Sequence, residues 1–205
     1  MPDQIDDKAT ARSRFVNNRR ALGNRERARQ SALAVRRLLA EPLLTSARTV
    51  AAYWPLGTEP DARGLVDALL ARGAEVLLPV VLPDRDLDWA RYAGDAAELV
   101  AAGSGTLGPE GRTLGTEAVL GAQVVLVPAL AVTPKGVRLG RGGGSYDRVL
   151  ARIAAAAAGG LDVPWTCALL YDGELGALGS GAVEAHDRAV NAACTASRLM
   201  EFHSL

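Results

Sequence analysis

Five consecutive apolar residues, Val124 to Pro128, stand before a glycine-rich stretch and a strongly helical segment. A continuous apolar run of this length is typical of a strand in a parallel sheet that is covered on both faces. Similar reasoning predicts further strands at 49–53, 75–78 and 164–170, and helices at 61–72 and 146–158. Strands that alternate with helices in this way predict an α/β fold, with one three-layer domain and a largely parallel central sheet flanked by helices.

The N-terminal part of the chain is expected to be helical. Apolar residues recur at helical spacing between residues 8 and 39, and Gly23 and Asn24 are expected to divide this stretch into two helices. Pro42 lies just past the expected helix end. We therefore expect residues 1–205 to form one domain with the helical segment 8–41 packed on it. Three further expectations are an edge strand at 87–92, a surface loop at 103–115, and a short final strand with loops at 183–197.

Composition excludes several classes of function. The chain has 205 residues, with 23 basic and 23 acidic side chains, and this zero net charge argues against a dedicated nucleic-acid binder. Two cysteines and two histidines are too few for a disulfide scaffold or a zinc cluster. The N-terminus lacks the apolar stretch of a signal peptide, and no apolar run approaches the ~20 residues that span a membrane. We expect a cytoplasmic protein that binds no membrane.

The densest chemical signal lies between Arg138 and Asp147, where four glycines occupy five positions between a strand and a helix start. Glycines allow backbone N–H groups to converge on an anion, and a helix N-terminus adds a positive partial charge. Arg138 and Arg141 supply guanidinium groups that suit phosphate oxygens. Asp147 lies where a carboxylate can hold Mg²⁺ beside a polyphosphate. The stretch predicts a phosphate site, and the alternative is a plain glycine turn capped by Ser145.

Two common nucleotide motifs do not fit this stretch. A Walker A loop needs a Gly-Lys-Ser/Thr sequence, and no lysine is present here. Counted from Gly140, the last glycine of a dinucleotide fingerprint is replaced by Ser145. A nicotinamide-dependent reductase with a degenerate fingerprint stays an alternative. Its ribose-binding acid would be Asp162, which precedes a predicted strand instead of ending one.

The sequence LGRGGGSYDR at 139–148, preceded by VPALA at 127–131, resembles the signature of the 5-formyltetrahydrofolate cyclo-ligase family. The resemblance covers nearly the whole chain. Lys8 and Arg12 match a K-x-x-x-R pattern whose side chains contact ATP phosphates in the family. The segment 53–61 matches the family's folate-contacting segment, with Glu59 at its acidic position. Pro109-Glu110 and the His186-Asp187 pair match two further family positions.

The resemblance implies ATP- and Mg²⁺-dependent cyclisation of 5-formyltetrahydrofolate to 5,10-methenyltetrahydrofolate, through phosphorylation of the formyl oxygen. Its implied small-molecule substrates are ATP and the folate, with Mg²⁺ as cofactor, and the protein would be a monomer or a homodimer. The implied catalytic residues are Lys8, Arg141 and Asp147. The implied metal ligands are Asp147 and Asp187, and the folate-binding residues are Tyr53, Trp54, Glu59 and Tyr146. The implied ATP-binding residues are Lys8, Arg12, Arg138, Leu139, Gly140, Arg141, Gly142, Gly143, Gly144, Ser145 and Tyr146.

The chain also departs from the family pattern. Val132-Thr133 replaces a Phe-Asp pair, Ser145 replaces an aromatic residue, Gly111 replaces a proline, and Asn191 stands where an aspartate is common. The phosphate-facing groups are retained. An alternative to the enzyme is therefore a catalytically impaired relative that still binds nucleotide or folate.

Overall fold

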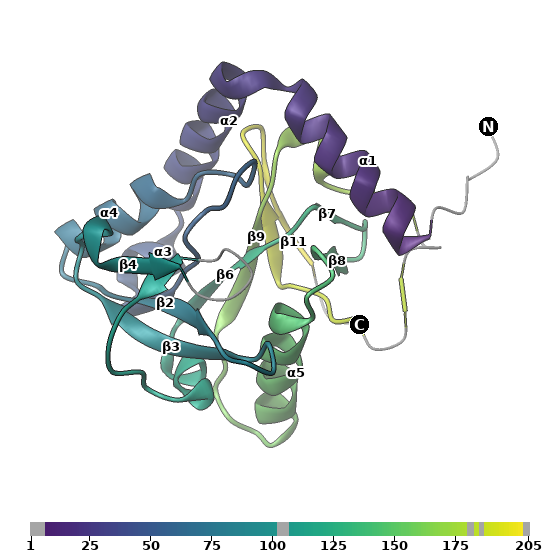
Figure 1. Ribbon diagram of the computed structural model, residues 1–205. Coiled ribbons are helices and arrows are strands. Elements are labelled where there is room, and N and C mark those ends of the chain that lie inside the picture. Colours follow the sequence, from purple (N-terminus) through teal and green to yellow (C-terminus); the bar gives the residue numbers. More distant parts are fainter. Residues whose placement is uncertain (1–6, 102–106, 180–182, 185–186, 203–205) are drawn as a thin grey trace.

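The computed structural model describes residues 7–101, 107–179, 183–184 and 187–202 (Figure 1). Its α-helices are α1 Lys8–Ala21, α2 Gly23–Leu38, α3 Pro42–Ser46, α4 Arg63–Ala71 and α5 Ser145–Ala158. The strands of the main sheet are β1 Thr49–Ala51, β2 Glu75–Val81, β3 Leu87–Tyr92, β6 Val124–Pro128, β9 Trp165–Leu169, β10 Ala192–Cys194 and β11 Leu199–Glu201. Two small sheets pair β4 Leu99–Ala101 with β5 Leu107–Pro109, and β7 Ala131–Val132 with β8 Arg138–Leu139. Short 3₁₀ helices are η1 Ala96–Glu98, η3 Thr116–Gly121 and η4 Asp172–Glu174.

The main sheet has the strand order β11-β10-β9-β6-β1-β2-β3. The five inner strands run parallel to one another, and only the edge strands β3 and β11 are antiparallel to their neighbours. The predicted α/β fold with a largely parallel sheet is therefore confirmed.

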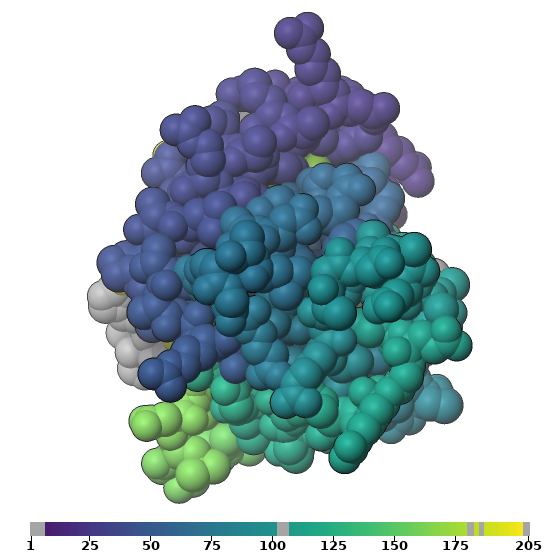
Figure 2. Space-filling view, turned by 90° about the vertical axis from the view of Figure 1, so that its left-hand side faces the viewer, coloured from purple at the N-terminus to yellow at the C-terminus, as the bar shows by residue number. Residues whose placement is uncertain are grey.

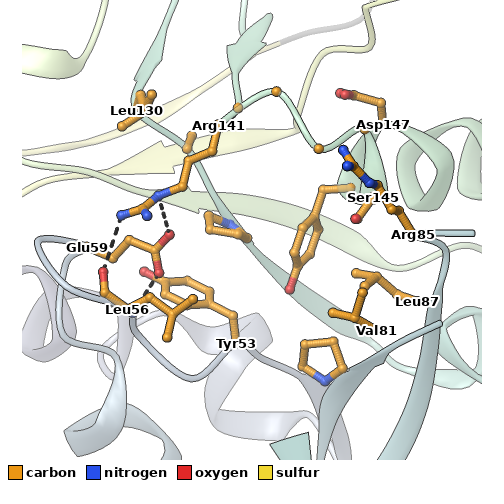
Figure 3. Close-up of a pocket in the computed structure, with 18 of the residues that line it drawn as sticks. Tyr53, Leu56, Glu59, Val81, Arg85, Leu87, Leu130, Arg141, Ser145 and Asp147 are labelled. Atoms are coloured by element: carbon orange, nitrogen blue, oxygen red, sulfur yellow. Dashed lines mark hydrogen bonds and ion pairs between the residues drawn. The ribbon is translucent and has the colours of Figure 1, made fainter. Parts of the chain in front are cut away.

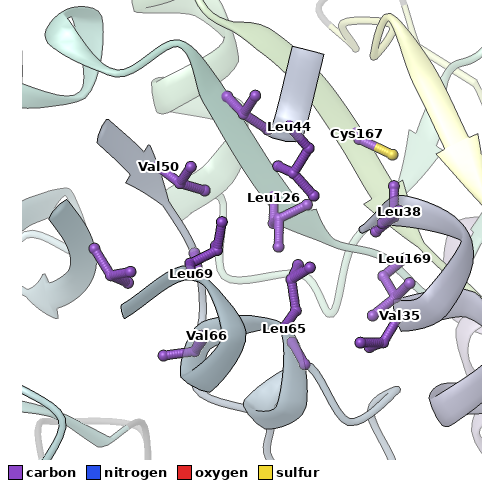
Figure 4. Close-up of a cluster of buried hydrophobic side chains, with 14 of the residues drawn as sticks. Val35, Leu38, Leu44, Val50, Leu65, Val66, Leu69, Leu126, Cys167 and Leu169 are labelled. Carbon is purple, nitrogen blue, oxygen red and sulfur yellow. The ribbon is translucent and has the colours of Figure 1, made fainter. Parts of the chain in front are cut away.

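Helices cover both faces of this sheet because every inner strand is apolar on both sides. Val50, Leu126 and Leu169 face one layer, where they pack against α2, α3 and α4 (Figure 4). Val125 and Ala168 face the other layer, which contains α5 and η3. In Figure 2 the purple N-terminal part of the chain lies at the top of the molecule, above the blue-to-teal middle part of the chain. Helix α1 packs through Phe15 on a third, smaller apolar cluster.

Strand β2 was predicted to stop at Pro79, but it continues to Val81. The backbone carbonyl of Leu77 accepts from the N–H of Ala52, so Leu77 faces β1. Pro79, two residues further on, faces the same side, where β1 has already ended. The missing N–H of Pro79 therefore breaks no ladder hydrogen bond, and the residue pairs with Trp89 on the other side.

One other local prediction was wrong. The expected surface loop at 103–115 contains β5, because Gly108 lets this strand lie directly against β2: a Cβ on Gly108 would come within 2.6 Å of the carbonyl oxygen of Pro79. Pro42 follows the end of α2 at Leu38, as predicted, and it also opens the short helix α3, where its fixed φ suits the first helical turn.

Candidate functional site

A cavity of about 290 Å³ lies where the chain leaves β1 and β6. The connection after β1 runs through α4 on one face of the sheet, and the connection after β6 runs through α5 on the other. Adjacent parallel strands whose connections leave to opposite faces open a crevice at their carboxyl ends, which is the usual ligand site of open α/β sheets. Tyr53, just after β1, and Pro128, at the end of β6, both line the cavity.

The glycine-rich stretch forms one wall of this cavity. All of its predicted residues except Leu139 line the space, whereas Leu139 is buried beneath α1. Gly142 has φ +98° and Gly144 has φ +76°, backbone conformations that favour glycine. Gly144 is the N-cap of α5, and no described side chain caps this helix. Ser145 therefore does not cap this helix, contrary to that part of the glycine-turn alternative, and the first amides of α5 have no capping side chain among the described residues.

Arg138 and Asp147 join β8 to the first turn of α5. Arg138 Nη2 donates to Asp147 Oδ1 at 2.7 Å, and the guanidinium lies 5.8 Å from the centroid of the Tyr146 ring. Burial lowers the pKa of Arg138, whereas the Asp147 side chain is 37% exposed. Arg138 Nε and Tyr146 Oη are buried without a hydrogen-bond partner in the described part of the chain. Buried polar groups normally have hydrogen-bond partners, so these two atoms leave hydrogen-bonding capacity unused on this wall of the cavity.

Glu59 and Arg141 face each other across the opposite side of the cavity (Figure 3). Arg141 Nε lies 3.1 Å from Glu59 Oε1, and the N–H of Leu56 donates to Glu59 Oε2 at 2.9 Å. The carboxylate is only 8% exposed, and burial raises the pKa of Glu59, although the Leu56 hydrogen bond and Arg141 act in the other direction. The result is a sheltered carboxylate beside a half-exposed cation.

The pKa of Glu59 predicts how its replacement changes stability. The folded protein binds the Glu59 proton more tightly than the unfolded chain does. Ionisation of Glu59 therefore lowers the free energy of unfolding, and this loss develops as pH rises from the ordinary pKa of glutamate through the raised pKa of the folded state. We expect Glu59→Gln to gain stability relative to the original protein as pH rises from about 4.3, the ordinary pKa of glutamate, to neutral pH. Thermal denaturation of both proteins across this range measures the difference. A difference that stays constant or shrinks as pH rises would contradict the burial of this carboxylate.

Tyr53 and Trp54 serve both the core and the cavity. Tyr53 is buried in the main core, and its hydroxyl donates to the carbonyl of Pro60 at 3.0 Å. Trp54 packs edge-on against Tyr92, with ring centroids 5.4 Å apart. Both aromatic residues also line the cavity. An apolar wall beside them is formed by Pro79, Val81, Leu87 and Leu107.

Helix α1 brings one of its two predicted residues to the glycine-rich stretch. Arg12 Nε donates to the carbonyl of Gly140 at 3.0 Å, and a Cβ on Gly142 would lie 3.4 Å from the Arg12 guanidinium carbon. Lys8, one turn earlier, instead donates to Asp187 at 2.9 Å and pairs with Glu184 at 3.1 Å. Lys8, Arg12 and Asp187 are not among the residues that line the cavity. His186 lies outside the described residues.

Arg19 is a cavity-lining residue that the sequence reasoning missed. Its side chain is fully buried and donates through Nε and Nη2 to the Glu174 carboxylate at 2.6 and 2.8 Å. Nη2 also donates to the carbonyl of Ala129 at 2.5 Å. The available signal was the spacing of Ala11, Phe15 and Arg19 every fourth residue, which places the arginine on the buried face of α1.

The donor set limits how a metal ion can bind. The described residues hold no group of three or more His, Cys, Asp or Glu side chains that could hold a metal ion. Mg²⁺, however, is usually bound by one or two carboxylates together with water and substrate phosphates. Asp147 fits that role because it is partly exposed and lines the cavity. Asp187 is only 7% exposed and is already paired with Lys8.

Together, the fold and the site define an α/β protein with a crevice at the carboxyl ends of its parallel strands, lined by a glycine-rich stretch and arginine side chains. A model of the 5-formyltetrahydrofolate cyclo-ligase family matches residues 4–196, and the chain belongs to this family. The resemblance noted in the sequence is confirmed, and so is the expected enzyme class, an ATP-dependent ligase of one-carbon metabolism.

Individual relatives support this assignment. The 5-formyltetrahydrofolate cyclo-ligase of Mycolicibacterium smegmatis is 42% identical over 155 residues, which cover 73% of this chain and 78% of the relative. The NMR structure of the Aquifex aeolicus 5,10-methenyltetrahydrofolate synthetase has a TM-score of 0.77 at 25% identity, covering 97% of this chain and 94% of that one. A Mycoplasma pneumoniae synthetase shares the fold, with a TM-score of 0.70 at 18% identity over 93% of this chain and 99% of that one.

Among the described residues, no helix combines the length and apolarity needed to cross a membrane.

Proposed function

We propose that this cavity binds ATP and 5-formyltetrahydrofolate side by side and converts them to 5,10-methenyltetrahydrofolate, ADP and phosphate. Family membership and the 42%-identical relative support the overall reaction. The observation that carries the proposal is the division of one cavity into two ends. The uncapped start of α5 and the glycine-rich stretch form an anion-binding end, and Glu59 with the apolar wall forms an end suited to a flat, polar-edged ring.

The chemistry needs an activated formyl oxygen. An oxygen of this amide-like group leaves poorly, so the γ-phosphoryl group is transferred to it, and the bond between that phosphorus and ADP breaks. N10 of the folate then attacks the activated carbon and loses its proton. Departure of phosphate with the original formyl oxygen leaves the methenyl bridge. In phosphoryl transfer of this kind the protein mainly positions the reactants and neutralises charge.

The triphosphate is assigned to the glycine-rich end of the cavity. Backbone N–H groups from Gly142 to Ser145 would donate to phosphate oxygens, while Arg138 and Arg141 would balance their charge. Arg12 supports this stretch from behind through the carbonyl of Gly140. Lys8 lies one turn before Arg12, and in this proposal it exchanges its carboxylate partners for a phosphate oxygen when nucleotide binds.

Asp147 would hold Mg²⁺ together with phosphate oxygens, and Asp187 is the second candidate ligand. When bound, this ion would supply positive charge to the phosphate oxygens between which the phosphoryl group moves. Arg138 holds the Asp147 carboxylate at 2.7 Å and thereby fixes its direction at the start of α5.

The folate ring is assigned to the end of the cavity near Glu59. This carboxylate would accept hydrogen bonds from the pterin, and Arg141 holds it in place at 3.1 Å. Tyr53, Trp54 and Tyr146 offer ring surface at the cavity wall. The orphaned hydroxyl of Tyr146 is a further group that can bind a substrate.

Two neighbouring glycines provide a matched test of the phosphate assignment. Gly142→Ala forces a side chain into the left-handed region and against Arg12, whereas Gly143 has no positive φ and nothing closer than 3.8 Å to an added Cβ. Strain of about 1–3 kcal/mol at Gly142 should raise the KM for ATP about 5- to 150-fold, whereas Gly143→Ala should stay within about 3-fold. Steady-state kinetics at varied ATP measures both. Equal effects of the two substitutions would contradict the assignment.

The departures from the family pattern mostly lie away from the cavity lining. Val132 and Thr133 are buried around β7, where the Thr133 hydroxyl accepts from the backbone of the following turn. Asn191 accepts from the backbone and hydroxyl of Thr166 at 2.8 Å, which ties β10 to β9. Among the departing positions only Ser145 lines the cavity. No observation therefore favours the catalytically impaired alternative.

A direct assay tests the proposed reaction. The purified protein should produce the absorbance of 5,10-methenyltetrahydrofolate from 5-formyltetrahydrofolate and Mg-ATP, with one ADP formed per product. Omission of ATP should abolish the signal, and Lys8→Ala should weaken it. Turnover that proceeds equally well without ATP would refute the phosphorylation step.

A further inference from the structure

Arg85 is the only non-glycine residue with a positive φ in the described part of the chain, at +69°. It lies in the turn between β2 and β3. There the N–H of Arg85 donates to the carbonyl of Leu82, and the N–H of Leu82 donates to the carbonyl of Asp86. This is a hairpin in which a tight turn is followed by one left-handed residue, and glycine is the usual choice at that position. An arginine there costs conformational energy, and such outliers concentrate at functional sites.

The turn that carries Arg85 is tied to the helix across the cavity. Asp86, the next residue, pairs with Arg152 of α5 at 2.7 Å, and Arg152 also pairs with Glu117 at 2.7 Å. Both side chains of the Asp86–Arg152 pair are largely buried, at 15% and 16% exposure. The hairpin tip is therefore held against α5, which keeps Arg85 beside the cavity although the turn itself is exposed.

The Arg85 side chain lines the cavity. In Figure 3 it extends toward the end of the cavity formed by Ser145 and Asp147, on the side opposite Glu59. Within the described residues its guanidinium has no hydrogen-bond or ion-pair partner. The Asp147 carboxylate, which also lines the cavity, is already bonded to Arg138. Arg85 is thus a cation in a strained turn, it faces the proposed anion-binding wall, and it has no partner among the described residues. These are the properties of a ligand-binding group.

We propose that Arg85 is a further phosphate-binding residue, which contacts the triphosphate of ATP from the side of the cavity opposite the glycine-rich stretch. The inference rests on the proposed function of this cavity. With Arg138 and Arg141 on one wall and Arg85 on the other, the phosphates are enclosed by guanidinium groups from two separate parts of the fold. A guanidinium that contacts the moving phosphoryl group adds to the stabilisation of the transferred charge.

The test uses the conformation of Arg85 as well as its charge. Arg85→Gly removes the cation and also relieves the backbone strain, so thermal stability should stay equal or rise while kcat/KM for ATP falls about 10- to 100-fold. Arg85→Asn, which tolerates the left-handed conformation, should reproduce the kinetic loss, and Arg85→Lys should recover part of it. Arg48→Ala, which removes an exposed arginine at the opposite end of the sheet, is the matched control and should remain within about 2-fold of the original protein.

Varying each substrate separately identifies the anion. The proposal predicts that the loss appears at limiting ATP. A loss confined to limiting 5-formyltetrahydrofolate would overturn it, because Arg85 would then bind the carboxylates of the folate. Variants whose kcat/KM for ATP equals that of the original protein would also overturn it. In that case, turnover by the original protein would still support the proposed function of the cavity.

Discussion

Asp147→Asn is expected to lower kcat by about 100- to 1,000-fold while the protein keeps its fold. The amide oxygen of asparagine can still accept the hydrogen bond from Arg138, so the start of α5 should keep its geometry. The change removes one negative charge from the partly exposed carboxylate that we assign to Mg²⁺. The expected signature is a lower kcat together with a requirement for more Mg²⁺, measured by titrating the metal at saturating ATP.

Asp162→Asn is the matched control for this prediction. Asp162 is an exposed aspartate beyond the end of α5 and is absent from the cavity lining. Its replacement should leave kcat and the Mg²⁺ requirement unchanged. If Asp147→Asn behaves like this control, the carboxylate at the start of α5 has no part in phosphoryl transfer.

Glu174→Gln is expected to cause the largest loss of stability, because it leaves the fully buried Arg19 guanidinium without its counter-charge. Breaking a buried ion pair from one side typically costs about 3–5 kcal/mol. For a chain of this size that corresponds to a fall in Tm of about 6–20 °C. Thermal denaturation at neutral pH measures the change.

A surface pair provides the comparison. Glu117 pairs with Arg152 but is 69% exposed, so Glu117→Gln should cost less than about 1 kcal/mol. The double variant Arg19→Met with Glu174→Leu should recover much of the lost stability, because it removes both buried charges together. A Tm for Glu174→Gln no lower than that of Glu117→Gln would show that the Arg19–Glu174 pair does not anchor α1 to the sheet.

The parts of the fold that sequence reasoning predicted well are those in which local chemistry decides the structure. The apolar run that became β6 and the glycine-rich stretch before α5 fall into this group. In both cases the residues in the pattern determine the conformation, with no need for information from elsewhere in the chain. The same holds for the break between α1 and α2 near Gly23.

The parts that were missed depend on distant partners. Arg19 is one of 23 basic residues, and its burial is explained by a carboxylate 155 positions away. Pro79 sits inside β2 because β1 ends early, which only the strand register reveals. The sequence did not single out Arg85, because the case for it rests on a positive backbone φ and on its place in the cavity lining, and both are known only from the structure.

The central claim is that nucleotide binds at the turn between β8 and α5. The most direct measurement follows the backbone amide resonances of an isotopically labelled sample during titration with a non-hydrolysable ATP analogue and Mg²⁺. We expect the largest shifts at Gly142 to Asp147, with residues at the opposite end of the sheet, such as Arg48 and Ala74, unaffected. Saturable binding that shifts other amides and leaves those of Gly142 to Asp147 unchanged would contradict it.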